Sequence, residues 1–166
     1  MQKIPVKTKY GIFSLFVTPK GLCAVRFPGK NPAHTPGVCL GTHRVCERVK
    51  RAFAVYFKDP KTVFKMDLDL SRCTEFERNV YRALQRVPAG TVITYGSLAK
   101  RAGHPGAARA VGTAMRKNPL PIVIPCHRVI PSKGGLGAYS AGTKWKRTLL
   151  EHERTVSAQR SLSLET

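Results

Sequence analysis

The sequence predicts an α/β N-terminal domain, with a small antiparallel sheet and a helix, followed by a mainly α C-terminal domain containing a helix-turn-helix. Three observations support this division. Strand-like runs at residues 12–17 and 22–27 flank a Thr-Pro-Lys-Gly turn and form a hairpin. Near residue 71 the pattern changes, and Thr74 with Glu77 forms a capping box that opens a helix. Beyond it, two short helical segments meet at a tight Gly-containing turn.

The first domain is assigned to residues 1–70. After the hairpin, residues 28–41 are rich in Pro and Gly and predict a loop. Residues 42–57 predict a helix with one apolar face. That face consists of Val45, Val49, Phe53 and Tyr56. Residues 61–68 alternate in polarity and predict a further strand, with antiparallel order favoured in so short a unit.

The second domain is assigned to residues 71–155. Its first helix presents an apolar face made of Phe76, Val80, Tyr81, Leu84 and Val87. Residues 94–102 and 107–117 are the paired helices, and the second is expected to turn Ala107, Ala110, Val111, Ala114 and Met115 inward. Residues 122–124 predict an apolar strand, residues 133–142 a Gly-rich loop, and residues 143–152 a last helix. The polar residues 156–166 are predicted to be a disordered tail.

Charge is the most informative bulk property. The chain has 166 residues with 29 Lys and Arg against 9 Asp and Glu, a formal net charge of +20. No acidic residue occurs between Arg78 and Leu150. Because the cations of this stretch are spread over several predicted elements, a folded domain with a phosphate-facing surface is favoured. An anionic membrane surface and simple solvation of the charges are the alternatives.

Compartment and membrane association follow from other features. No apolar run approaches the roughly 20 residues that span a bilayer, and the N-terminus lacks an apolar signal region. Five cysteines without regular spacing favour a reducing compartment. We therefore expect an intracellular protein, in the cytoplasm of a prokaryote or archaeon or in a nucleus, with no membrane partner.

Cys126 carries the sharpest chemical signal. A free Cys after an apolar run is usually inert packing, but here His127 and Arg128 follow directly. An imidazole can take the thiol proton, and cations favour the nucleophilic thiolate. Adjacent side chains of a strand point apart, so a relay through water is expected between thiol and imidazole. Glu153 shares a helical face with Leu149 and is a candidate partner for His127, although a solvated helix end explains it equally.

Longer strings around this cysteine resemble a known family. PCHRVI, preceded by GHPGAARAVGTAM and RKNPLPIVI and followed by GAYSAG and LLEHE, is similar to the active-site region of O6-alkylguanine-DNA alkyltransferases. These are also called methylated-DNA–protein-cysteine methyltransferases. The resemblance extends from about Thr74 to Glu153, whereas the first 70 residues match only loosely. It implies a winged helix-turn-helix alkyl-acceptor domain, a monomer that acts on double-stranded DNA containing alkylated guanine, and no cofactor.

The resemblance also implies an activity with residue roles. The alkyl group passes from O6-alkylguanine irreversibly to Cys126, once per molecule, and O4-alkylthymine is a second candidate substrate. His127 acts as base through a water, and Glu153 orients it. The Tyr95 hydroxyl donates a hydrogen bond near guanine N3, and Lys146 and the backbone N–H of Ser140 make further contacts around the base. The remaining implied residues serve the substrate pocket: Met115 and Tyr139 line it, the carbonyls of Cys126 and Val129 accept from the guanine amine, and Asn118 braces the turn before the active-site strand.

The second helix of the pair is implied to bind the minor groove. Ala107, Ala108 and Gly112 allow close approach to the backbone, and Arg109 fills the gap left by the flipped nucleotide. Without the resemblance, Arg109 is better explained as an ordinary contact to a DNA phosphate. Tyr95 is explained equally well as a buried core residue.

Three other kinds of site or protein have to be weighed beside this resemblance. A structural zinc site occurs in some members, but Cys23, His34, Cys39 and Cys46 lack zinc-ligand spacing, so no metal is predicted. A non-enzymatic DNA binder of this class has no need of the Cys126 thiol. A cysteine hydrolase usually places its Cys and His far apart in sequence, unlike Cys126 and His127.

Overall fold

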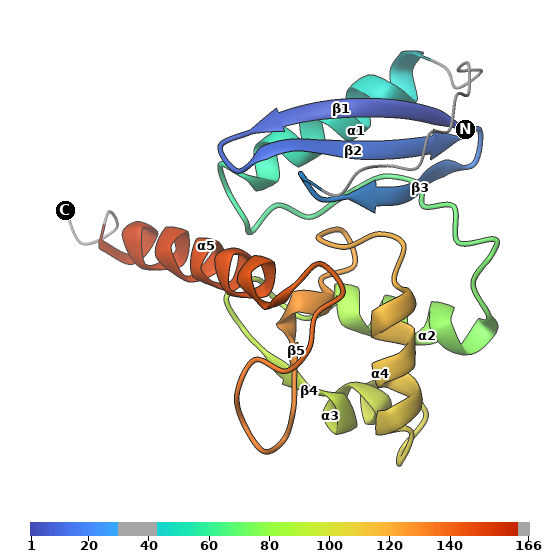
Figure 1. Cartoon of the computed structure of the whole chain (residues 1–166), viewed down its shortest axis with the longest axis vertical. Helices are drawn as coiled ribbons and strands as arrows, with labels where there is room; N and C mark the ends of the chain where they lie inside the picture. Colours follow the sequence, from blue (N-terminus) through green and yellow to red (C-terminus); the bar gives the residue numbers. More distant parts are fainter. Residues whose placement is uncertain (30–42, 163–166) are drawn as a thin grey trace. The chain divides into compact units, whose positions relative to one another are not determined.

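The computed structural model describes residues 1–29 and 43–162, in two compact units, Met1–Arg72 and Cys73–Thr166 (Figure 1). The boundary falls two residues beyond the predicted one. Each unit is built around its own core of buried apolar side chains. Most of the predicted Pro- and Gly-rich loop, residues 30–41, lies outside the described residues.

The first unit is a three-stranded antiparallel sheet with a helix against it. Its strands are β1 (Gln2–Thr8), β2 (Gly11–Thr18) and β3 (Gly21–Arg26), in the order β1-β2-β3, and α1 (His43–Tyr56) packs on β1. The predicted hairpin is confirmed as β2 and β3. Phe13 of β2 and Phe53 of α1 are fully buried, with ring centroids 6.4 Å apart. This apolar contact fixes the helix on the sheet.

The predicted strand at residues 61–68 is wrong. This segment pairs with β3 only at its end, through an isolated parallel bridge between Leu22 and Leu68. Two hydrogen bonds hold it there, from Leu22 N to Asp67 O at 3.0 Å and from Asp69 N to Leu22 O at 2.9 Å. The chain passes so close to Gly21 that a Cβ there would lie 2.2 Å from the Asp67 oxygen. Glycine is therefore required at this crossing.

The second unit opens with α2 (Glu75–Gln85), and its predicted capping box is confirmed. The Thr74 hydroxyl accepts from Glu77 N at 3.2 Å, and Thr74 N donates to the Glu77 carboxylate at 2.9 Å. The inner face of α2 is buried, and the Tyr81 hydroxyl donates to Ala114 O at 3.0 Å. This hydrogen bond ties α2 to a later helix of the same unit, α4 (Ala108–Lys117).

The predicted pair of short helices is present as α3 (Tyr95–Arg101) and α4 (Ala108–Lys117), which pack on each other. Thr94 caps α3 by accepting from Ser97 N at 3.2 Å. In α4, Val111, Ala114 and Met115 are buried as predicted. Ala110 is exposed, so its predicted inward position is wrong.

The predicted strand at residues 122–124 is also wrong. The chain makes a tight turn in which Ile124 N donates to Leu120 O at 2.8 Å, and Ile122 adopts a left-handed φ of 78°. A β-branched residue in this region is strained, and Pro121 and Pro125 limit the alternatives. A single 3-10 turn, η1 (Cys126–Arg128), follows, and then β5 (Val129–Ile130) pairs in parallel with β4 (Ile93–Thr94).

The last helix, α5 (Thr143–Leu162), is longer than predicted. Residues 156–162, the first part of the predicted disordered tail, fall within the bounds of this helix, while residues 163–166 lie outside the described part of the chain. No helix in residues 1–29 or 43–162 has the length and apolar character needed to cross a bilayer.

Candidate active site around Cys126

A cavity of about 240 Å³ lies beside Cys126 in the second unit. Most of its wall consists of residues that the sequence singled out: Tyr95, Arg109, Gly112, Met115, Cys126, Tyr139 and Ser140. Three more, Thr113, Arg116 and Ala138, complete the lining. The site therefore combines α3, α4, η1 and the loop before α5. Residues 107, 108, 118, 127, 129, 146 and 153, also singled out, are not part of the wall.

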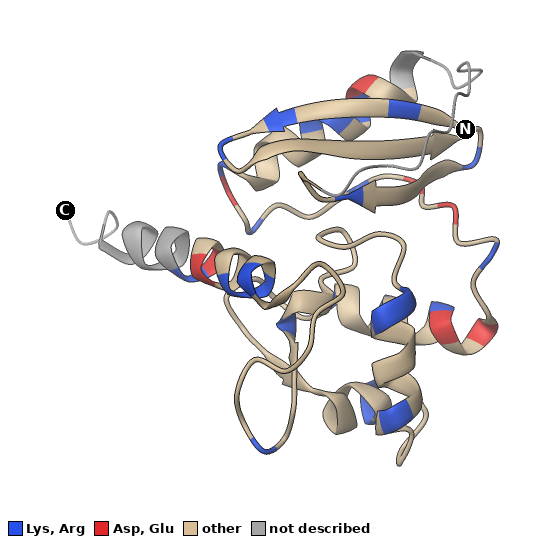
Figure 2. Ribbon diagram, in the orientation of Figure 1, with Lys and Arg blue, Asp and Glu red and all other residues tan. Residues whose placement is uncertain are grey.

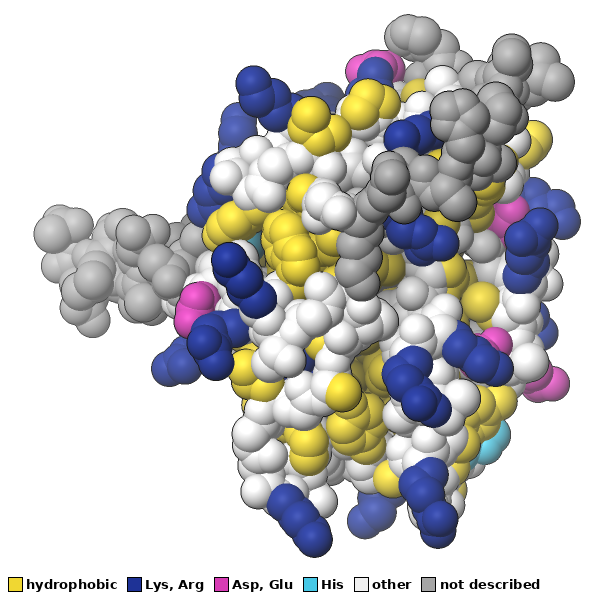
Figure 3. All heavy atoms as spheres, viewed as in Figure 1, with side chains coloured by type: hydrophobic (Ala, Val, Ile, Leu, Met, Phe, Trp, Pro, Cys, Tyr) yellow, Lys and Arg dark blue, Asp and Glu magenta, His cyan; other side chains and the backbone are white. Residues whose placement is uncertain are grey.

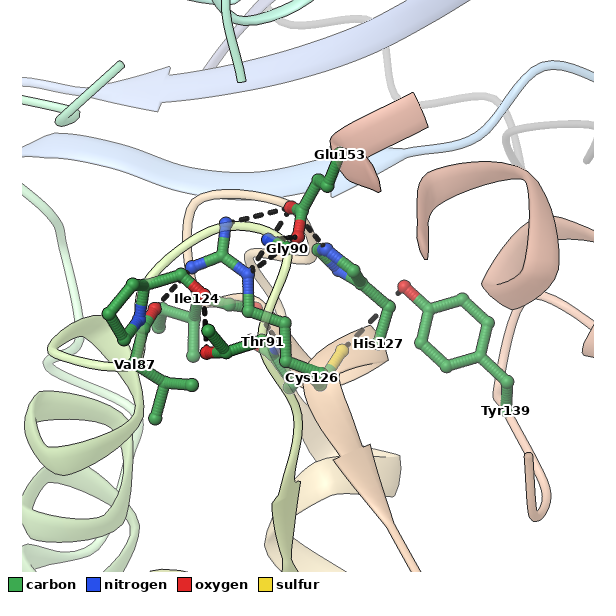
Figure 4. Close-up of polar contacts among 11 residues, drawn as sticks. Val87, Gly90, Thr91, Ile124, Cys126, His127, Tyr139 and Glu153 are labelled. Carbon is green, nitrogen blue, oxygen red and sulfur yellow. Dashed lines mark hydrogen bonds and ion pairs between the residues drawn. The ribbon is translucent and has the colours of Figure 1, made fainter. Parts of the chain in front are cut away.

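The Cys126 sulfur is buried, and it lies 3.7 Å from the Tyr139 hydroxyl (Figure 4). Burial raises the pKa of the Cys126 thiol, and hydrogen bonding from Asn118 and Tyr139 opposes that rise without cancelling it. The nearby cations therefore do not outweigh burial, and Cys126 keeps its thiol proton at rest. Arg128 points away from the sulfur, because it is bound to Glu153.

Glu153, on α5, is fully buried and surrounded by donors (Figure 4). His127 Nε2 lies 2.8 Å from its carboxylate, Arg128 donates to it from Nη2 at 2.7 Å and from Nε at 3.1 Å, and Gly90 N donates at 3.0 Å. Burial alone would raise the pKa of Glu153, but hydrogen bonds and charge from His127 and Arg128 hold it well below its usual range. The predicted pairing of Glu153 with His127 is present, and the solvated helix end is excluded.

His127 is held in one tautomer by this carboxylate. Burial lowers the pKa of His127, so the ring is neutral at neutral pH. A neutral imidazole facing a carboxylate carries its proton on the facing nitrogen, Nε2. Its Nδ1 is buried and has no hydrogen-bond partner among the described residues. The ring thus presents a free lone pair in the interior of the site.

Lys146 and Val129 form a separate contact. The Lys146 ammonium is 1% exposed and donates to Val129 O at 2.6 Å. Burial lowers the pKa of Lys146. Because the Lys146 ammonium already donates to the Val129 carbonyl, the main effect of this contact is to hold β5 against α5.

Asn118 braces the turn that leads to Cys126. Its side-chain amide donates to Ile124 O at 2.9 Å, and its side-chain oxygen accepts from Leu120 N at 3.0 Å. Both bonds are buried, and they close the segment that contains the strained Ile122. The brace predicted for Asn118 is present in the structure.

Tyr95 and the residues of α4 that line the cavity form another part of its wall. Burial, and then the charge of Cys126, raise the pKa of Tyr95, so its hydroxyl keeps its proton. Arg109 is exposed at the rim, whereas Ala107 and Ala108 are half-buried. A Cβ on Gly112 would lie 3.9 Å from the Tyr95 ring, an ordinary contact, so Tyr95 does not demand glycine there.

Sequence reasoning missed several contributors. Arg128 was expected only as a neighbour of the thiol, although its contact is Glu153. The Gly90 N–H carried no signal, because any residue supplies one. Thr113 and Arg116 follow Arg109 and Gly112 at helical spacing, so the periodicity of α4 could have identified them.

Among the described residues, no group of three or more metal-binding side chains occurs. Cys23 donates to Phe16 O at 3.2 Å, and Cys46 to the Gln2 side chain at 2.7 Å. His34 and Cys39 lie outside the described residues.

Several known proteins are similar to this chain in sequence. A family model, "6-O-methylguanine DNA methyltransferase, DNA binding domain", matches residues 75–155. The methylated-DNA–protein-cysteine methyltransferase of Mycolicibacterium paratuberculosis is 50% identical over 63% of this chain and 67% of its own length. That of Methanosarcina acetivorans is 37% identical over 81% of this chain and 86% of its own length. A Mycobacterium tuberculosis relative aligns over 60% of each chain, at 47% identity.

Solved structures agree with these relatives over nearly the whole chain. The crystal structure of Mycobacterium tuberculosis OGT in complex with DNA superposes with a TM-score of 0.80, at 33% identity, and covers 94% of both chains. The O6-methylguanine-DNA methyltransferase of Pyrococcus kodakaraensis superposes with a TM-score of 0.65, at 30% identity, covering 91% of this chain and 97% of that one. This chain belongs to the methylated-DNA–protein-cysteine methyltransferase family.

Proposed function

We propose that this protein repairs DNA by moving the alkyl group of O6-alkylguanine irreversibly onto Cys126. The observation that carries the proposal is a nucleophilic sulfur in the wall of a cavity, backed by the buried His127–Glu153 pair. The crystal structure of the Mycobacterium tuberculosis relative in complex with DNA supports DNA as the partner.

The transfer is a single displacement. The Cys126 sulfur forms a bond to the alkyl carbon, the bond from that carbon to guanine O6 breaks, and the electron pair leaves with the base. The thiol proton passes through a water to the free Nδ1 of His127. The Tyr95 hydroxyl, which keeps its proton, donates toward the departing base. The product is a thioether, which thiol exchange does not reverse, so each molecule acts once.

Because its pKa is raised, Cys126 rests as a thiol, and its proton has to leave during the reaction. The neutral His127 is ready to accept it, since Glu153 holds Nε2–H and stabilises the imidazolium that forms. Arg128 keeps Glu153 ionised by binding both of its oxygens. The thiolate is thus produced beside its target instead of standing exposed to other electrophiles.

The pocket residues divide between the alkyl group and the base. Met115 and Tyr139 line the cavity, and the Tyr139 hydroxyl lies 3.7 Å from the Cys126 sulfur, so both are assigned to the alkyl group. The Ser140 backbone and the Cys126 carbonyl are assigned to the base. Lys146 acts by fixing Val129 and β5, and the Val129 carbonyl can accept a second donor from guanine through its other lone pair.

DNA binding is assigned to α3 and α4, as a winged helix-turn-helix in a monomer. O6 is inaccessible to a buried thiol while guanine is stacked, so the nucleotide must be flipped out of the duplex. Arg109, exposed at the rim of the cavity, is placed to fill the vacated stack. The surface of α4 has small residues at Ala107, Ala108 and Gly112. The helix can therefore approach the DNA backbone along the minor groove closely.

The direct test is to measure the intact mass of the full chain after incubation with an excess of duplex DNA that contains O6-methylguanine. We expect one added methyl group per molecule, located by peptide mapping on Cys126, and no further uptake on prolonged incubation. Uptake of several methyl groups, or uptake on another residue, would contradict the proposal. No uptake at all, with DNA binding intact, would favour a non-enzymatic DNA binder.

Arg109→Ala is expected to slow repair of a methylated duplex about 10- to 100-fold, because an unfilled stack makes base flipping cost a few kcal/mol more. Transfer from the free base O6-benzylguanine needs no flipping and should change less than about twofold. Single-turnover rates on both substrates measure the two effects. Arg82→Ala, an exposed cation on α2 outside the cavity, is the matched control. Equal losses on duplex and free base would remove Arg109 from base flipping.

A further inference from the structure

Half of the excess positive charge lies in the unit that contributes nothing to the cavity. Residues 1–72 contain 14 Lys and Arg against 4 Asp and Glu, and residues 73–166 contain 15 against 5. Figure 3 shows Lys and Arg side chains over both units, with few acidic side chains among them. Alkyl transfer at Cys126 does not account for so basic a first unit.

Part of this charge gathers around α1. The inner face of α1 is buried through Val49 and Phe53, so its outer face is open. Two hollows flank the helix, one of about 340 Å³ beside β1 and one of about 560 Å³ beside residues 62–65. The cationic residues that line them are Lys7, Arg48, Lys50, Arg51 and Lys65. These five residues are called the α1 basic face.

The α1 basic face keeps most of its charge. Among the described residues, Glu47 is the one acidic residue that lines the two hollows, and its carboxylate holds Lys50 at 2.8 Å. Arg48 and Arg51 are three residues apart, on adjacent turns, and both are exposed. Lys7 lines the first hollow and Lys65 the second, and both are exposed. In Figure 2 the same region shows blue on β1 and α1 with one red turn.

We propose that the α1 basic face is a second DNA-backbone site, which binds phosphates of undamaged duplex independently of the Cys126 cavity. The cations of the α1 basic face are spaced along a helix and across two shallow hollows. This arrangement suits a row of DNA phosphates better than it suits a ligand with a single anionic group. No base reading is involved, so the site raises affinity for any sequence and keeps the protein on DNA while the second unit searches for the lesion. This inference goes beyond the alkyl transfer and does not depend on it.

The test uses the full chain with three substitutions, Arg48→Gln, Arg51→Gln and Lys65→Gln. Affinity for undamaged duplex is measured between about 50 and 200 mM salt, where the slope of log K against log salt counts neutralised phosphates. Each contact removed should lower the slope by about 0.9, so the triple variant should lose about 2.7. Alkyl transfer from the free base should equal that of the wild type, which separates this inference from the proposed function.

The matched control neutralises three other exposed cations of the same unit, Lys9→Gln, Lys20→Gln and Arg26→Gln. We expect the control to keep the wild-type slope. Equal losses in both variants would mean that only bulk charge matters and would overturn the proposal, as would an unchanged slope in the first variant.

Discussion

Cys126→Ala is expected to take up no alkyl group from a methylated duplex while still binding that duplex. The substitution removes the only strong nucleophile among the described residues of the cavity wall: the Tyr95 hydroxyl stays protonated, and the other lining side chains are guanidinium, thioether, hydroxyl or aliphatic. Intact-mass spectrometry should detect no addition, a complete loss. Binding of methylated and undamaged duplex should stay within about threefold of the wild type, since the surface of α4 is unchanged.

The matched control is Cys73→Ala, a half-buried cysteine in the same unit that does not line the cavity. It should keep full uptake. Cys126→Ala should also remain folded, with a change in unfolding free energy on the order of 1 kcal/mol, since it removes one buried heavy atom. A methyl group added to folded Cys126→Ala would place the acceptor elsewhere.

The chemistry of the site was largely readable from the sequence because it is local. Cys126, His127 and Arg128 are consecutive, and Glu153 lies on the same helical face as the buried Leu149. An acidic residue on a core-facing stripe needs a partner, which made His127 a candidate for Glu153, although the spacing fitted a solvated helix end equally well. The strings shared with the alkyltransferases then gave each residue a role. The periodicity of the helices also predicted α2, α3 and α4 with nearly correct ends.

Elements that depend on contacts distant in sequence were not predictable in the same way. Residues 122–124 are apolar and β-branched, which favours a strand, yet two prolines and the Asn118 brace close them into a turn. β4 and β5 have two residues each, too few for any periodicity. β1 was missed because Pro5 interrupts it, although an edge strand tolerates proline. That Arg128 points to Glu153 and not to the sulfur depends on α5, which arrives from far along the chain.

Glu153→Gln is expected to cost about 3–5 kcal/mol of unfolding free energy, the largest stability effect of any substitution in the site. A glutamine keeps the volume but leaves Arg128, which is 7% exposed, without a counter-charge in the interior. Its amide group also faces the donors of Arg128 and Gly90, to which it can offer fewer acceptors. Alkyl transfer should slow at least about 100-fold, since His127 loses its orientation and the stabilisation of its charged form. Glu151→Gln, exposed on the same helix, should change stability by less than about 0.5 kcal/mol.

The pH dependence of the wild type distinguishes a charged network from simple packing. The pKa of His127 is lowered in the folded state, so its contribution is present at neutral pH and is lost as pH falls below about 6.5. The pKa of Glu153 is also lowered, so its contribution is present above about pH 4.5 and is lost as pH falls further. The stability difference between wild type and Glu153→Gln should therefore shrink as pH falls below about 4.5, by up to about 1.4 kcal/mol per pH unit. Urea unfolding from pH 7 down to pH 4 and below measures this difference. If it stays constant across the range, Glu153 is not held as a buried carboxylate, and the proton relay through His127 loses its basis.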